Sequence, residues 1–419
     1  MNDIARDGVT QQAGTVIVGG GIWGLSTAYH LARAGKTDVQ VLERNDRPFD
    51  ETTSQAAGLV GQIRATPLMR RAIRYAIDLF TSFERETGHD PGFRQAGSLL
   101  LALTPERMAS FEEHVEHANE NGVEARFVDE AEMSRLAPHL DVRRVEGGYF
   151  VSEDGYLDPR RCARAFCAAA EDLGARIRTG TAATGLSVRD GRVVGVETGS
   201  GFVEAEQVVV AAGPWTGIVT KTVGFEPAMV PIRHQRVTTA PVPGIPDHHP
   251  VVRVTDVSCY LRPEEGGYLY GFFEPDPTSY NLEELPPGFR TADMEEPVEV
   301  MEEARERLTP TFPVLKELEI VGYKRGLTTF AADGAYLIGP VQQVDGLFAA
   351  TGCAALGIAG SAAVGRWLAN WVMHGDPGED LSSVSLDRFG DKASDRDWVR
   401  REGEEFYGGY YSIPSMSVT

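Results

Sequence analysis

Three glycines near the N-terminus and one glutamate downstream of them have the spacing of a nucleotide-binding motif. Gly19, Gly21 and Gly24 stand between the apolar run TVIV and the helical pattern LSTAYHLARAG, and Glu43 ends the next apolar run, DVQVLE. Glycines at such a turn let the backbone approach a pyrophosphate at a helix N-terminus, and the acid accepts hydrogen bonds from ribose hydroxyls. The spacing therefore predicts a dinucleotide site.

Two distant segments indicate that the dinucleotide is FAD rather than NAD. QVVVAAGPW (207–215) and GLFAATG (346–352) each carry an apolar strand pattern into a small-residue turn that contains glycine. A cofactor that is contacted near residues 20, 213 and 355 must be long, and the chain must fold back to reach it. Such a pattern is typical of FAD enzymes with a discontinuous FAD-binding domain.

The elements that must position these residues predict an α/β (α+β) fold. We expect a discontinuous Rossmann-like FAD-binding domain with an inserted, antiparallel, β-rich substrate-binding domain. Local signals include helical periodicity over 66–87, a helix start at Asp158-Pro159 and a hairpin turn at Asp190-Gly191. The predicted boundaries are 1–90, 145–225 and 321–384 for the FAD-binding domain, 91–144 and 226–320 for the substrate-binding domain, and 385–419 for a charged C-terminal tail.

Composition narrows the possible partners and compartments. The 419 residues carry a net charge of -21, which argues against nucleic acid or an anionic membrane as a partner. Four cysteines without a metal-ligand cluster, and an N-terminus without a signal-peptide pattern, favour a cytoplasmic protein with no metal site. The uncharged run 347–365 is rich in glycine and alanine and predicts a strand, a turn and a buried helix. His248 and His249 are expected to face solvent.

Longer stretches of the sequence resemble one branch of flavoproteins. VIVGGGIWGLSTAYHLARAG, TTSQAAGLVG, PIRHQRVTT, CYLRPEEGGYLYGFFE and WVMHGDPGEDL look like the dimethylglycine and sarcosine dehydrogenase branch of the D-amino-acid-oxidase-type family. The resemblance covers nearly the whole chain. Longer members of that branch carry a C-terminal folate-binding half, and this sequence stops about where that half would begin. The resemblance therefore implies a stand-alone oxidase or dehydrogenase module.

The resemblance also implies which residues hold the FAD. It places contacts in the glycine turn, after the second strand, in the stretch 52–59, near the adenine and in the turn 352–358. The last turn is expected to open a helix at Gly357 and Ile358, whose N-terminus would stabilise negative charge on the flavin. The full predicted set is Gly19, Gly21, Ile22, Trp23, Gly24, Glu43, Arg44, Thr53, Ser54, Gln55, Ala57, Gly58, Leu59, Ala183, Ala212, Gly213, Trp215, Gly326, Gly352, Ala355, Leu356, Gly357 and Ile358.

By the same resemblance, His234 and Tyr260 are the catalytic candidates. They match a histidine and a tyrosine beside the flavin, and either could accept or orient a substrate proton. Arg64 could anchor a substrate carboxylate bidentately, although a surface arginine is an equal alternative. Phe273 lies on an aromatic strand that could line the substrate pocket or only pack. The implied reaction is oxidation of a C–N bond in a small secondary or tertiary amine, with demethylation through an iminium.

The sequence also departs from the family pattern. A histidine that bonds covalently to the flavin in dimethylglycine and sarcosine dehydrogenases is replaced by Gln55 in the pair Ser54-Gln55. The flavin-linking cysteine of monomeric sarcosine oxidases falls at Gly326, so we expect noncovalent FAD. Their oxygen-activating lysine falls at Leu269 and their carboxylate-binding lysine near Ala359. The substrate need not be sarcosine, and the acceptor could be O2 or an electron-transfer protein.

Three alternatives remain open on sequence grounds. The first is oxidation of the α-carbon of a D-amino or imino acid, which would release ammonia or a keto acid product. The second is a flavin-binding subunit that relays electrons without acting on an amine. The third is an NAD-dependent dehydrogenase, which would be colourless. The sequence does not fix the oligomeric state.

Overall fold

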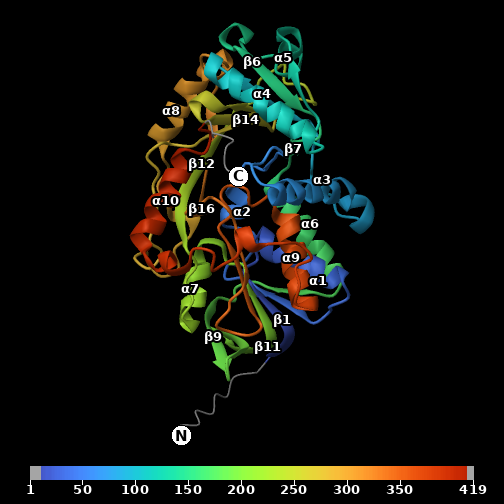
Figure 1. The fold of residues 1–419 in the computed structure, drawn as a ribbon, viewed down its shortest axis with the longest axis vertical. Coiled ribbons are helices and arrows are strands. Elements are labelled where there is room, and N and C mark those ends of the chain that lie inside the picture. The colour runs from blue at the N-terminus through green and yellow to red at the C-terminus, as the bar shows by residue number, and fades with distance from the viewer. Residues whose placement is uncertain (1–10, 413–419) are drawn as a thin grey trace.

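The computed structural model describes residues 11–412, whose strands form two large sheets and one small one (Figure 1). The first large sheet has a parallel centre, in which β1 lies between β2 and β11, and β11 also pairs with β18. A β9–β10 hairpin extends this sheet from β11. Its strands are β1 (Gln11–Val18), β2 (Val39–Leu42), β8 (Arg176–Arg178), β9 (Ala183–Arg189), β10 (Arg192–Thr198), β11 (Gly201–Val210), β17 (Leu337–Pro340) and β18 (Leu347–Thr351).

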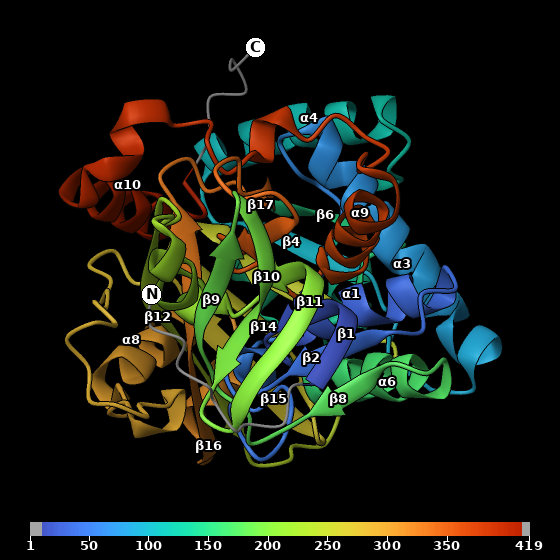
Figure 2. The ribbon, with the colours of Figure 1, turned by 90° about the horizontal axis from the view of Figure 1, so that it is seen from below.

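Four helices pack together on one side of the first sheet (Figure 2). In this layer α1 (Ile22–Arg33) packs against both α6 (Pro159–Asp172) and α9 (Ser361–His374), and α3 (Pro67–Thr87) packs against α9. Their apolar faces share one buried core with Ile17 and Val41 of the parallel strands. This layered arrangement is the Rossmann-like part that the sequence predicted.

The second large sheet is antiparallel except where β13 pairs with β4. Helices α4 (Pro105–Glu120), α5 (Glu130–Leu136) and α8 (Val298–Leu308) lie around it, and α10 (Arg396–Gly408) packs on β12 and β16 (Figure 1). Short elements α2 (Thr52–Gln55), α7 (Thr216–Thr220), β3 (Leu59–Val60) and β7 (Gly155–Tyr156) lie outside the two sheets. The strands are β4 (Ser98–Ala102), β5 (Ala125–Val128), β6 (Gly147–Val151), β12 (Met229–Thr239), β13 (Val251–Val254), β14 (Cys259–Glu264), β15 (Gly267–Phe272) and β16 (Ile320–Ala331).

The local sequence signals explain where the main helices begin and end. The Thr66 hydroxyl accepts from the Met69 backbone N–H at 3.3 Å, Pro67 opens α3, and Gly88 ends it in a left-handed conformation. The Asp158 carboxylate caps α6 by accepting from the Arg160 backbone N–H at 2.8 Å. The helix expected over 66–87 and the helix start predicted at Asp158-Pro159 are thus confirmed, and Asp190-Gly191 joins β9 to β10 as expected.

Two of the predicted FAD-binding segments contribute strands to the second sheet. In 145–225 this strand is β6, and in 321–384 it is most of β16. The reason is strand pairing, since β16 matches β12 over nearly its whole length, from Ala331 opposite Met229 to Ile320 opposite Thr239. The domain boundaries themselves remain a prediction.

Three local expectations need correction. Residues 385–412 are not a bare tail, because α10 packs on the second sheet and buries Val399 and Tyr407; residues 413–419 lie outside the described part. His249 does not face solvent, because its imidazole is fully buried and Nδ1 lies 2.8 Å from the Pro250 carbonyl. The helix after the turn 352–358 begins at Ser361 rather than at Gly357.

The uncharged run 347–365 forms β18, a turn and the start of the buried helix α9, as the sequence predicted. Across residues 11–412, no helix is both long and apolar enough to cross a membrane.

Candidate active site

A cavity of about 1030 Å³ is lined by the loops that leave the parallel strands and by residues of the second sheet. Gly19 follows β1, Ala211 follows β11 and Cys353 follows β18, and all three line it. Because β1, β11 and β18 are adjacent and parallel, these loops meet at one edge of the sheet. Ligands bind at this edge in open α/β sheets.

The glycine turn is shaped by close backbone contacts. Gly19 has φ +112°, and a Cβ there would lie 2.4 Å from the Ala211 carbonyl oxygen. The Glu43 carboxylate accepts from the backbone N–H groups of Gly20 at 2.9 Å and Asn45 at 2.8 Å. Burial raises the pKa of Glu43, although these N–H groups act against that shift. The motif therefore brings a helix N-terminus and an acid to one wall of the cavity.

A strained turn, residues 352–358, also lines the cavity. Ala354 and Ala355 have φ of 44° and 57°, which non-glycine residues seldom adopt. The Thr328 hydroxyl accepts from the Ala355 backbone N–H at 3.0 Å, and the Trp23 indole donates to the Gly357 carbonyl at 2.8 Å. Strain of this kind persists where the surroundings hold it, and it clusters at ligand sites.

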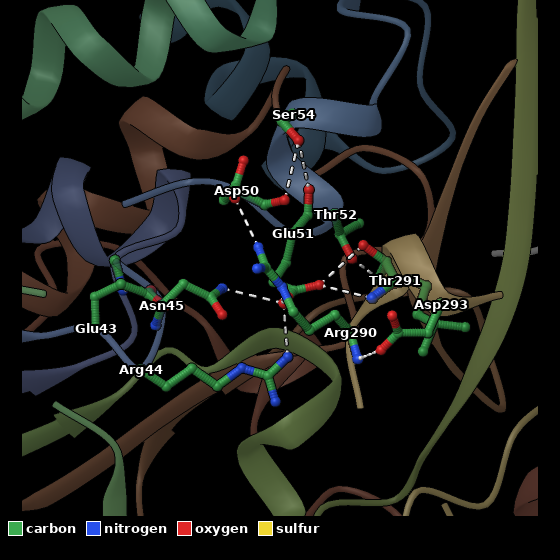
Figure 3. Close-up of polar contacts among 12 residues, drawn as sticks. Glu43, Arg44, Asn45, Asp50, Glu51, Thr52, Ser54, Arg290, Thr291 and Asp293 are labelled. Carbon is green, nitrogen blue, oxygen red and sulfur yellow. Dashed lines mark hydrogen bonds and ion pairs between the residues drawn. The ribbon is translucent and has the colours of Figure 1, made fainter. Parts of the chain in front are cut away.

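A network centred on Glu51 fixes the start of the stretch 51–59 (Figure 3). Its carboxylate accepts from Arg44 at 2.7 Å, from Asn45 at 3.0 Å, and from the Thr291 backbone N–H and hydroxyl at 2.9 Å each. Burial acts to raise the pKa of Glu51, but the Thr291 N–H and Arg44 outweigh it and the pKa is lowered. The Arg44 guanidinium also lies 3.7 Å from the centre of the Trp215 ring.

Two buried arginines hold the middle of the same stretch. Arg236 on β12 donates to the carbonyl groups of Gln55 at 2.9 Å and Ala56 at 3.1 Å, and Arg262 on β14 donates to that of Ala57 at 2.7 Å. Through these hydrogen bonds, two strands of the second sheet hold the backbone of residues 55–57 in place. Hydrogen bonds from charged donors are about twice as strong as neutral ones.

His234 and Tyr260 line the cavity, and His234 links Tyr260 to Tyr407, which does not line it. Its Nε2 lies 2.9 Å from the Tyr260 hydroxyl and its Nδ1 lies 2.8 Å from the Tyr407 hydroxyl. Burial lowers the pKa of His234 to about 3 and raises that of Tyr260 above its usual range. At neutral pH the imidazole is therefore uncharged, and one of its nitrogens donates while the other accepts.

Aromatic rings surround His234 and Tyr260. The Phe273 ring lies 4.5 Å from that of His234 and stacks on Tyr410 at 4.1 Å. Of the aromatic strand, Phe273 lines the cavity, whereas Tyr268, Tyr270 and Phe272 pack into a core on the other side of the sheet. This part of the cavity is apolar, with a few hydrogen-bonding groups placed in it.

Most of the residues predicted from sequence line the one cavity. They come from distant parts of the chain, and contact with a cofactor remains a prediction for each. Three predicted cofactor contacts do not line it. A Cβ on Gly24 would lie 2.0 Å from the Gly19 carbonyl, and the Ser54 hydroxyl donates to the Asp50 and Glu51 carbonyls. A Cβ on Gly352, at the start of the turn 352–358, would lie 3.1 Å from the Leu337 backbone nitrogen. The predicted residues that line the cavity are Gly19, Gly21, Ile22, Trp23, Glu43, Arg44, Thr53, Gln55, Ala57, Gly58, Leu59, Arg64, Ala183, Ala212, Gly213, Trp215, His234, Tyr260, Phe273, Gly326, Ala355, Leu356, Gly357 and Ile358.

Sequence reasoning missed the residues that support the site. The aromatic cluster in EEFYGGYYSIP was the available signal for Tyr407, Tyr410 and Tyr411, but charge around it suggested a solvated tail. Arg236 and Arg262 lie two residues from His234 and Tyr260, on the same faces of their strands, and gave no signal of their own.

These features fit FAD. The glycine turn, the Glu43 carboxylate and the turn 352–358 lie along one continuous cavity, and a Cβ on Gly213 would meet no atom within 4 Å. The length of this cavity and the open space at Gly213 suit a long dinucleotide. Gln55 and Gly326 offer no nucleophile on the wall that they share.

Comparison with known proteins gives the same result. Mouse dimethylglycine dehydrogenase is 32% identical over 95% of this chain and 46% of its own length. The 4-methylaminobutanoate oxidase (formaldehyde-forming) of Paenarthrobacter nicotinovorans is 31% identical over 98% of this chain and 49% of its own length. The chain thus spans about half the length of these relatives. The crystal structure of L-proline dehydrogenase from P. horikoshii has the same fold, with a TM-score of 0.81 at 23% identity over 91% of this chain and 98% of that one.

The family model for FAD dependent oxidoreductases matches residues 15–371, which include the glycine turn, the His234–Tyr260 pair and the turn 352–358. The chain therefore belongs to the FAD dependent oxidoreductase family, among relatives of the dimethylglycine and sarcosine dehydrogenase type.

Proposed function

We propose that this chain oxidises a C–N bond of a small secondary or tertiary amine, by oxidative N-demethylation of an N-methylated amino acid-like substrate. The observation that carries the proposal is the uncharged His234 beside Tyr260 in the cavity that the glycine turn also lines. When bound, FAD would supply the acceptor for the hydride equivalent that leaves the N–CH3 carbon. The resulting iminium takes up water and yields formaldehyde and the demethylated amine.

The chain's own residues would prepare the amine. An aromatic, water-poor wall disfavours the ammonium form, so the substrate reacts as the neutral amine. Because burial lowers the pKa of His234 to about 3, the uncharged imidazole would serve as the hydrogen-bond partner that orients the Tyr260 hydroxyl towards the substrate nitrogen. Phe273 would pack against the substrate, and Arg64 would bind a carboxylate on it.

FAD is proposed to be held without a covalent bond, because neither Gln55 nor Gly326 carries a group that can attack the flavin. The protein would then retain FAD through Glu43 and through the stretch 51–59, which the Glu51 network, Arg236 and Arg262 hold in place. O2 or an electron-transfer protein would take the electrons, and the cytoplasm remains the expected compartment.

The test is anaerobic bleaching of the purified yellow protein by N-methyl amino acids and by D-amino acids. The proposal expects bleaching by N-methyl substrates with one formaldehyde formed per flavin reduced. Ammonia or keto acid without formaldehyde would favour α-carbon oxidation, and no bleaching by any amine would favour a non-catalytic flavin subunit. Admission of air then separates an oxidase, which regains its colour fast, from a dehydrogenase.

A further inference from the structure

A loop between β15 and α8 forms one wall of the cavity. Its residues 281–290 read NLEELPPGFR, and we call this segment the strap. The strap follows a strand of the second sheet, whereas the glycine turn follows a strand of the first. The chemistry proposed at His234 does not use it. The strap residues that line the cavity are Leu282, Leu285, Pro286, Pro287, Gly288 and Phe289.

The two ends of the strap are tied to two different segments of the chain. Near its start, the Glu283 carboxylate pairs with the ammonium group of Lys221, which directly follows α7. Just past its end, the backbone N–H and the hydroxyl of Thr291 each donate to the Glu51 carboxylate at 2.9 Å (Figure 3). The strap therefore runs from α7 to the start of the stretch 51–59.

Between these two anchors lies the part of the cavity beside Glu43. The next residue, Arg44, donates to Glu51 at 2.7 Å, and its guanidinium lies 3.7 Å from the centre of the Trp215 ring. Trp215 directly precedes α7, and Ile218 of α7 lines the cavity. An acid at the position of Glu43 binds the adenosine ribose in dinucleotide sites, so the strap lies at the adenosine half of the cavity.

Four apolar side chains at this half of the cavity are left out of the hydrophobic cores. Within residues 11–412, those cores include neither Ile218 nor Leu282, Leu285 and Phe289 of the strap, although all four line the cavity. Ile218 is 41% exposed, and the three strap residues are half-buried. Apolar side chains that gather on a concave surface indicate a ligand with an apolar face. The adenine ring has such a face.

The two anchors of the strap differ in strength. The side chains of Lys221 and Glu283 are 53% and 48% exposed, and an exposed ion pair contributes little and is screened by salt. The Glu51 side chain is only 16% exposed and accepts from Arg44 as well as from Thr291. The strap is therefore held firmly at Thr291 and loosely at Glu283.

We propose that the strap covers the adenine of FAD, and that FAD enters and leaves when the strap opens at its Glu283 end, with the Thr291 end as the hinge. In the closed strap, the apolar side chains would contact the adenine ring. Pro286 and Pro287 restrict the backbone between the two ends, so the strap would move as one piece. The assignment concerns the retention of FAD and does not depend on which amine is oxidised.

The first experiment loosens the outer anchor. Release of FAD from the diluted holoprotein is followed by flavin fluorescence, at the lowest temperature at which wild type releases FAD within an hour. Glu283→Gln should speed release about two- to fivefold in low salt, and added salt should speed wild type more than the variant. Combining it with Lys221→Gln should add nothing, because both changes remove the same ion pair. Glu303→Gln, which breaks an exposed ion pair on α8, is the matched control.

The second experiment shortens one apolar side chain. Leu285→Ala should speed FAD release about tenfold, because the adenine loses most of one leucine contact. The absorbance spectrum of the bound flavin should stay that of wild type, because the strap lies at the adenosine half. Leu173→Ala is the control, since that leucine is 41% exposed and lies outside the cavity.

Hydrogen exchange in the holoprotein shows where the strap opens. Backbone amides of 281–289 should exchange faster in Glu283→Gln than in wild type, while Thr291 and α8 keep their protection. Wild-type release and exchange in both Glu283→Gln and Leu285→Ala would overturn the strap.

The strap and the demethylase function can fail separately. If the variants release FAD as expected but no amine bleaches the flavin, the strap stands and the demethylase function fails. If wild type retains its flavin at every temperature, noncovalent binding fails, and hydrogen exchange in Glu283→Gln alone decides whether the strap opens at that end.

Discussion

Gln55 lies directly against Gly326, since a Cβ on Gly326 would stand 3.2 Å from the Cβ of Gln55. Gly326 is in turn the cross-strand partner of His234 in the β12–β16 pair. By resemblance, these two positions are the ones from which related enzymes attach their flavin covalently. The structure brings both to one wall, and neither side chain can form the bond.

The first prediction concerns cofactor release. Precipitation of the protein with acid should leave the yellow colour in the supernatant, because neither Gln55 nor Gly326 carries a nucleophile. The absorbance of both fractions is the measurement, with a pellet washed in denaturant as the control for trapped flavin. Colour that stays in the washed pellet would refute the prediction.

The second prediction concerns Gly271, whose missing side chain makes room for Tyr260. A Cβ there would lie 2.1 Å from the Tyr260 hydroxyl oxygen, so Gly271→Ala must displace the ring that bonds to His234. A displacement of about 1 Å can cost up to a hundredfold in rate, and we expect flavin reduction to slow by at least about tenfold. Gly185→Ala, where the nearest atom is 3.6 Å away, is the control. Equal rates in the two variants would contradict the proposed role of Tyr260.

The third prediction concerns Tyr407, which holds the other nitrogen of His234. Tyr407→Phe should slow flavin reduction about tenfold with little change in substrate affinity, because it frees the imidazole to change its tautomer. Tyr75→Phe is a matched control: Tyr75 bonds to the buried His30 at 2.9 Å, outside the cavity. Stopped-flow bleaching over a range of substrate concentrations gives both quantities. A change in affinity alone would mean that Tyr407 only shapes the pocket.

The fourth prediction concerns stability against pH. Burial lowers the pKa of His249 to about 4 from its ordinary value of 6.5, so the unfolded chain binds a proton that the folded chain rejects. This contribution to stability is complete above pH 6.5 and is lost as the pH falls towards 4, by about 2 kcal/mol at pH 5.

Comparison between variants isolates that effect. Burial raises the pKa of Asp154 and of Glu274, and these carboxyl groups act in the opposite direction. The measurement is therefore the free energy of unfolding in denaturant at pH 8 and pH 5 for wild type and His249→Asn. The variant should lose less stability between the two pH values, whereas His248→Asn, on an exposed residue, should follow wild type. Identical pH dependence in all three proteins would contradict the assignment.

The sequence predicted the glycine turn and its helix well, because Gly19 and Gly24 obey local steric rules that hold wherever the motif occurs. The sequence also identified His234 and Tyr260 as catalytic candidates, but only through resemblance to a known family. It could not predict the Tyr407–His234 contact, since that pairing joins residues 173 positions apart and depends on how α10 packs. Arg236 and Arg262 were missed for the same reason: a buried arginine is recognised by its acceptors, which are backbone carbonyls without a sequence signature.

The central place of β11 has a consequence for how the protein is made. This strand pairs in parallel with β1 on one side and with β18 on the other, so nearly half the chain separates it from β1 and a third from β18. Such long loops close slowly, and the turns that would surround FAD meet only when both pairings exist. A ligand that binds only the assembled state shifts the folding equilibrium by mass action. The supply of flavin during synthesis should therefore determine how much of the newly made chain reaches the native state and how much aggregates.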